Sequence, residues 1–230
     1  MQEIKKIIRD DHILYNVEIN RLLEIIFNMF DIAGKPCLKI DNKIPWGMAF
    51  FRDEPFNFYL NWQMVGENLK NKKIKEANYW IFFYCLHEVM HHRQLVSGIT
   101  EDEIVKDIFN RSYSYLEEIK KEKIIQVFHK IMYRMFHDYF PLEINADIMA
   151  YIKLLEILRE IDGEYYNVFL EYFKRRIEKI YEDDKLSDIY SMLLELDINL
   201  DSYSIEEKII YGMPISKDIV KTIDVVQLIK

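Results

Sequence analysis

The residues best suited to chemistry are His87, Glu88 and His91, in the run His-Glu-Val-Met-His inside the apolar stretch 79–96. Residues four apart share one face of an α-helix, so both imidazoles can reach a single cation. Glu88 follows the first histidine and can hold a water molecule bound to that cation. The spacing therefore predicts a hydrolytic zinc site with two nitrogen ligands and a carboxylate as general base.

A catalytic zinc ion needs a third protein ligand and leaves its fourth position to water. The best candidate begins a stripe with helical spacing i, i+3, i+4, i+7, formed by Glu143, Ala146, Asp147 and Ala150. The two alanines would let this helix approach the helix of His87 closely. Glu143 would then reach the metal, and Asp147 would accept the second ring N–H of a ligand histidine.

Each of these residues also has an ordinary structural interpretation. His87 and His91 could form a partly buried, hydrogen-bonded pair, and Glu143 could be a first-turn glutamate favoured by the helix dipole. Asp147 could itself be the third ligand, as in zinc enzymes that use aspartate. By its spacing His92 lies off the ligand face, so we expect it to be exposed to solvent or bound to a neighbouring carboxylate.

Helical and extended patterns alternate along the chain in a way that would position this site. Amphipathic spacing predicts helices at about 18–30, 74–97, 100–136, 141–161 and within 164–230. Between residues 36 and 62, short aromatic-rich runs separated by Asp, Asn and Pro predict two or three strands of a small antiparallel sheet. Because no repeat or linker interrupts residues 1–230, one mainly helical α+β domain is the simplest organisation.

Composition and charge argue against several classes of protein. Half of the 230 residues are hydrophobic, which is enough for a sizeable core. The net charge of −8 argues against a nucleic-acid partner, and the basic run 174–176 is expected to be a solvated helix face. No secretory signal or membrane span is evident. Cys37 and Cys85 make no disulfide framework, so we expect a cytoplasmic protein, with Cys85 in the core.

The HExxH run followed by a helix that reads Glu-Ile-Asn-Ala-Asp, an ExxAD motif, resembles the gluzincin metallopeptidases. The resemblance is to their compact, single-domain intracellular members. It implies that His87, His91 and Glu143 bind Zn²⁺. It also implies that Glu88 is the general base and that Asp147 orients a histidine.

The same resemblance implies a zincin-like fold, with an antiparallel sheet just before the HExxH helix. The edge strand of that sheet pairs with an extended substrate, and residues 56–61 occupy its place. The resemblance covers about 36–150, and the helical extension beyond 161 matches no part of the family. The family also supplies a Tyr or His that stabilises the oxyanion, for which the candidates are Tyr133, His137, Tyr139 and Tyr151.

These expectations describe a zinc-dependent metallopeptidase that acts on a protein or peptide, with neither a nucleic acid nor a membrane as partner. The alternative is a catalytically inactive zincin-like protein that binds metal or a protein partner in regulation or assembly. A fourth protein ligand closing the zinc shell would favour that alternative. A metal-free helical structural protein is a third possibility, which stoichiometric zinc would exclude. The sequence predicts neither the substrate nor the oligomeric state.

Overall fold

The computed structural model describes residues 1–51, 53–96, 141–182 and 204. The predicted helix at 100–136 and the part of the C-terminal extension from 183 onward, apart from Ser204, lie outside the described residues. The described residues fall into two compact units, one with residues 1–96 and 149–169, the other with residues 141–148 and 170–182. The prediction of a single domain over the whole chain stays a prediction.

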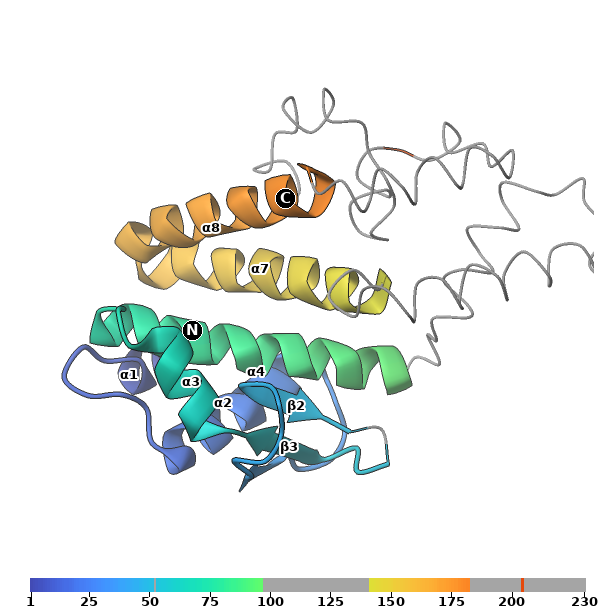
Figure 1. Cartoon of the computed structure of the whole chain (residues 1–230). Coiled ribbons are helices and arrows are strands. Elements are labelled where there is room, and N and C mark those ends of the chain that lie inside the picture. Colours follow the sequence, from blue (N-terminus) through green and yellow to red (C-terminus); the bar gives the residue numbers. More distant parts are fainter. Residues whose placement is uncertain (52, 97–140, 183–203, 205–230) are drawn as a thin grey trace, which may run out of the picture. The chain divides into compact units, whose positions relative to one another are not determined.

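The described part of the chain is mainly helical, with one small sheet (Figure 1). Its elements are α1 (Gln2–Ile7), α2 (Asn16–Met29), β1 (Cys37–Ile40), β2 (Met48–Phe50), β3 (Asn57–Leu60), α3 (Trp62–Leu69), α4 (Ile74–Val96), α7 (Pro141–Ile161) and α8 (Gly163–Glu182). The predicted helices at 18–30, 74–97 and 141–161 are confirmed as α2, α4 and α7. Among the described helices, none is long and apolar enough to cross a membrane.

The short helices α1 and α3 were not predicted. The sequence predicts extended structure as far as residue 62, whereas Trp62 begins α3. The reason lies in the preceding residue, because the side chain of Asn61 accepts a hydrogen bond from the backbone N–H of Met64 at 3.1 Å. This N-terminal cap starts a helix at a point where the aromatic-rich sequence looks extended.

The sheet is mixed, so the prediction of an antiparallel sheet is only partly right. The strand order is β1-β3-β2, and β3 runs antiparallel to β2 but parallel to β1. The prediction that 56–61 forms the edge strand is wrong, since β3 is paired on both sides. β3 follows β1 and β2 in the chain but lies between them in the sheet. No local sequence pattern predicts this order. Of the described strands, β2 pairs with β3 alone.

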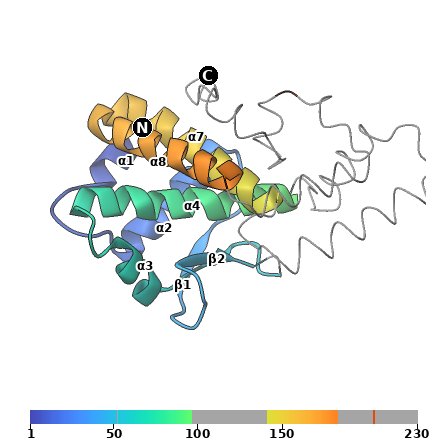
Figure 2. The same cartoon turned by 45° about the horizontal axis from the view of Figure 1, so that its top comes forward.

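Helix α4 is the central helix of the first unit. Its side chains Phe82, Leu86 and Val89 are fully shielded from solvent. Within this unit, α2 and β2 pack against α4, and Figures 1 and 2 both show α4 between α2 and the later part of α7. On the α7 side the ring of Tyr151 lies 4.4 Å from the ring of Phe83, measured between centroids.

Polar contacts near the start of α4 fix its alignment with α7. The hydroxyl of Tyr79 donates to Oδ2 of Asp162 at 2.9 Å, and Nζ of Lys75 lies 2.7 Å from the same oxygen. Tyr79 thus contacts Asp162, the residue after the end of α7. Phe83, four residues after Tyr79 on α4, contacts Tyr151, eleven residues before Asp162. Residue numbers therefore rise along α4 as they fall along α7, so the two helices are antiparallel.

Candidate metal centre

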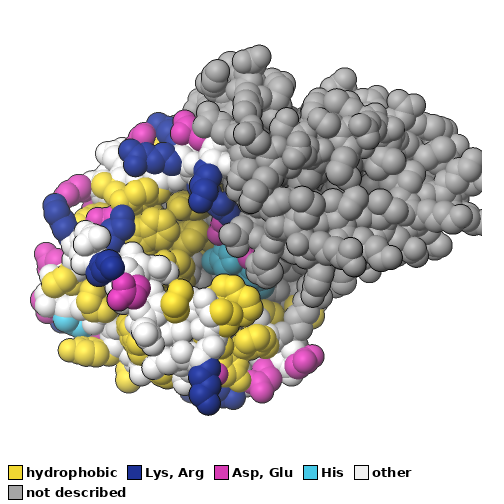
Figure 3. Space-filling view, viewed as in Figure 1, with side chains coloured by type: hydrophobic (Ala, Val, Ile, Leu, Met, Phe, Trp, Pro, Cys, Tyr) yellow, Lys and Arg dark blue, Asp and Glu magenta, His cyan; other side chains and the backbone are white. Residues whose placement is uncertain are grey.

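Helix α4 places His87 and His91 one turn apart on the same face. Their Nε2 atoms lie 3.1 Å apart, and both side chains are half-buried. Two nitrogens bound to one tetrahedral zinc ion at about 2.0–2.1 Å are roughly 3.3 Å from each other. The pair is thus within a few tenths of an ångström of a ligand spacing. Figure 3 shows histidine side chains (cyan) at the surface of this face of the molecule.

Gln94 holds the ring of His91 from the side opposite the pair. Nδ1 of His91 lies 3.0 Å from the amide oxygen Oε1 of Gln94, which is only 5% exposed. This contact was not predicted, although the i, i+3 spacing on a helix could have revealed it. The three residues His87, His91 and Gln94 are called the ligand face of α4 below.

Glu88 is buried beside the histidine pair, with 8% of its surface exposed. Burial raises the pKa of the Cys85 thiol, three residues earlier on α4, and the charge of Glu88 adds to the increase. Cys85 is fully buried, which confirms the prediction that it is a core residue. A carboxylate in such a low-dielectric position interacts strongly with any proton or cation that approaches it.

Glu143 belongs to the same group of possible metal ligands as the histidine pair. It lies in the first turn of α7. One ligand atom from each of His87, His91 and Glu143 lies within 4.8 Å of the other two. These are the three ligands that the sequence predicts.

This set of donor atoms fits a divalent metal ion. Two imidazole nitrogens and a carboxylate oxygen are among the ligands that zinc prefers. A tetrahedral shell requires ligand atoms about 3.3 Å apart. Rotation of the Glu143 side chain about its torsions can adjust its carboxylate toward that spacing.

Asp147 has a partner that the sequence did not reveal. Its Oδ2 accepts hydrogen bonds from Nη2 and Nε of Arg176, at 2.6 Å and 2.8 Å. Arg176 belongs to the basic run expected to be a solvated helix face, but its side chain is only 20% exposed. The prediction fails at this residue because the aspartate lies 29 positions earlier in the chain. The predicted contact of Asp147 with a ligand histidine stays a prediction.

His92 contradicts the expectation that it is exposed or bound to a carboxylate. It is 1% exposed, and the rings of Phe27, Phe50 and Phe56 surround it at centroid distances of 5.1–5.8 Å. Within the described residues, neither of its ring nitrogens has a hydrogen-bond partner. One residue on from His91, the helix has turned by about 100°, which directs His92 into the core. Burial lowers the pKa of His92.

Of the four candidates for oxyanion stabilisation, the structure describes only Tyr151. Tyr133, His137 and Tyr139 lie outside the described residues. Tyr151 is 5% exposed and packs against Phe83 and Trp80, at ring distances of 4.4 Å and 6.3 Å. Its ring thus contributes to the contact between α4 and α7.

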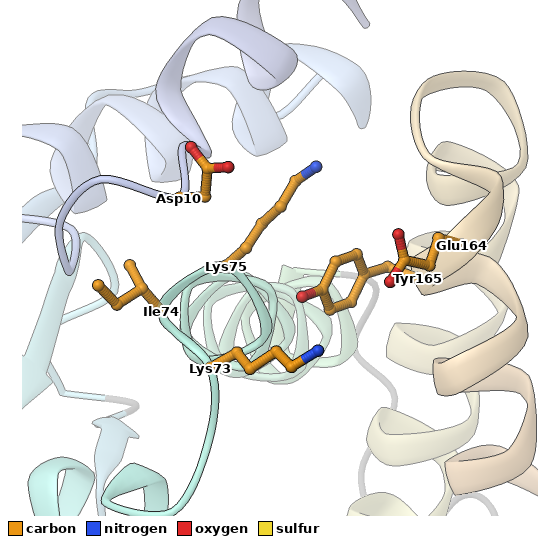
Figure 4. Close-up of a pocket in the computed structure, with 6 residues that line it drawn as sticks. All are labelled: Asp10, Lys73, Ile74, Lys75, Glu164 and Tyr165. Atoms are coloured by element: carbon orange, nitrogen blue, oxygen red, sulfur yellow. The ribbon is translucent and has the colours of Figure 1, made fainter.

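A separate hollow of about 470 Å³ lies at the opposite end of α4 (Figure 4). It is lined by Asp10, Lys73, Ile74, Lys75, Glu164 and Tyr165. The ammonium group of Lys75 is already bound to Asp162. Twelve residues of helix, about 18 Å, separate Lys75 from His87, so this hollow is distinct from the candidate metal centre.

Comparison with known proteins gives no independent assignment of this centre. No family model, no curated protein and no solved structure matches the chain. What the molecule does must therefore be argued from its own residues.

Proposed function

We propose that the chain is a zinc-dependent metallopeptidase with a zincin-like fold, acting on a protein or peptide in the cytoplasm. The observation that supports the proposal most strongly is the approach of His87, His91 and Glu143 to within 4.8 Å of one another. Their donor atoms suit Zn²⁺, although the same set would accept other divalent ions. The gluzincin-like order of HExxH and ExxAD in the sequence agrees with this grouping.

Glu88 is the residue that would move protons in the reaction. A metal ion in the centre would make a bound water more acidic and would polarise the carbonyl of the scissile bond. Glu88 accepts the proton of the attacking water and then donates it to the amine that leaves. Its place on the helix, directly after His87, keeps the carboxylate beside the ligands without making it one of them.

The outer edge of β2 is the place where an extended peptide could bind. β2 packs against α4, and of the described strands it pairs with β3 alone. A peptide added at this edge would be held by backbone hydrogen bonds, which constrain its sequence only weakly. This assignment replaces the segment 56–61, which lies in the middle of the sheet.

The test uses the purified full chain and a quenched random-peptide library. We expect zinc-dependent cleavage that a chelator abolishes. Glu88→Gln should lower the rate by about 10²–10⁴-fold and leave zinc content unchanged, because it removes the base but not a ligand. Glu67→Gln, at an exposed position in α3, is the matched control and should cleave at the wild-type rate.

Two results would count against the proposal. Cleavage by Glu88→Gln at the wild-type rate would show that Glu88 is not the base. A chain that binds zinc but cleaves no member of the library would favour an inactive zincin-like binding protein instead.

A further inference from the structure

We infer that Gln94 is a positioning residue, which selects the tautomer of His91 that presents Nε2 to a metal ion. The inference rests on the proposed zinc site, whose ligands include His91. Its basis is the 3.0 Å contact between Nδ1 of His91 and Oε1 of Gln94.

The chemistry of the two groups fixes where the proton lies. An amide oxygen can only accept a hydrogen bond, so Nδ1 of His91 must donate. In a neutral imidazole the other nitrogen then carries the lone pair, which is the form that binds metal. Nε2 of His91 is directed at Nε2 of His87, 3.1 Å away, and hence toward the place where an ion would lie.

The same contact also orders the proton of the second ring. Because Nε2 of His91 accepts, Nε2 of His87 is the donor in the metal-free pair. Gln94 therefore determines the hydrogen-bond direction through both candidate ligands. Hydrogen bonds of this kind commonly raise metal affinity by 10–100-fold, because they hold the ring in the ligating orientation.

The burial of Gln94 agrees with a positioning role. An amide side chain that is 5% exposed costs free energy unless its polar atoms are hydrogen-bonded. An apolar residue would fill the same volume without that cost. The hydrogen bond with the ring of His91, a candidate ligand, offsets part of this cost.

The experiment compares three variants of the full chain with the wild type. Gln94→Met keeps the side-chain length but removes the acceptor, and Gln94→Glu keeps an acceptor. Gln63→Met, at an exposed position in α3, is the matched control. Zinc affinity is measured by competition with a chromophoric chelator. The tautomer of each histidine is read from ¹H–¹⁵N spectra of the metal-free protein at pH 8.

We expect His91 of the wild type to carry its proton on Nδ1. Gln94→Met should lose this preference and bind zinc about 10–100-fold more weakly. Gln94→Glu should keep both the Nδ1 proton of His91 and the zinc affinity of the wild type. Gln63→Met should leave both unchanged. A role of Gln94 in stability alone would lower the unfolding temperature without changing the tautomer.

Failure of the inference and failure of the proposed site give different results. If the wild type binds zinc but metal-free His91 carries its proton on Nε2, the inference is overturned and the zinc site stands. That spectrum needs no variant, so it decides the matter even if Gln94→Met does not fold. If the wild type binds no zinc, the proposed function fails, and the tautomer still reports whether Gln94 orients His91.

Discussion

Two adjacent histidines of α4 lie in environments of opposite kind. His91 belongs to the ligand face and contacts the polar groups of His87 and Gln94. His92 is enclosed by phenylalanine rings, and no described residue satisfies its nitrogens. The two positions differ by about 100° of helical rotation. The chemistry available to a histidine in this run is therefore set by the side of the helix on which it lies.

The largest difference between the two histidines should appear in zinc binding. His91→Ala removes a ligand, so zinc affinity should fall by more than about 100-fold, the upper end for losing a group that only supports a ligand. His92→Leu should bind zinc as the wild type does. Competition with a chelator measures both. Equal losses in the two variants would remove the distinction between the two sides of the helix.

The next largest effect on zinc binding is expected at Glu143, the proposed third ligand. Glu143→Ala should weaken zinc binding by at least about 10-fold, because one oxygen ligand is lost. Glu156→Ala is the control on the same helix, since its carboxylate pairs with Lys153 instead. A larger loss in Asp147→Asn than in Glu143→Ala would identify Asp147 as the third ligand.

Loss of His92, which should not affect zinc binding, should increase the stability of the fold. His92→Leu should raise the free energy of unfolding by about 1 kcal/mol, because it removes a buried polar group without a described partner. Urea denaturation at pH 8 of the chelator-treated protein measures the change. Destabilisation of that size would instead mean that the ring of His92 is satisfied in solution.

The smallest effect concerns His12, which has charged partners, unlike His92. Its ring lies 3.0 Å from Glu18 and 2.9 Å from Asp11, and the hydrogen bond with Glu18 raises its pKa. The folded state therefore binds the proton more tightly than the unfolded state. The resulting stabilisation is complete below the unfolded pKa of about 6.5 and disappears as pH rises through the folded pKa.

Replacement of His12 by glutamine should therefore cost more stability at pH 5.5 than at pH 8.5. Thermal unfolding at the two pH values measures the difference. A cost that is the same at both values would show that protonation of His12 does not contribute to folding.

The sequence predicted the long helices and the histidine pair because both depend on local periodicity. Four-residue spacing brings His87 and His91 together on any α-helix, whatever surrounds it. The order of the strands was not predictable in this way, because β3 enters between two strands that precede it. The environment of His92 and the pairing of Asp147 with Arg176 likewise depend on residues distant in the chain.

We propose that one metal ion binds to His87, His91 and Glu143 together. The most direct test is metal analysis of the zinc-saturated full chain, combined with X-ray absorption at the zinc edge. We expect about one zinc ion per chain, with two imidazole nitrogens and a carboxylate oxygen at about 2.0–2.2 Å. Zinc well below one equivalent, or a shell unchanged in His87→Ala, would contradict it.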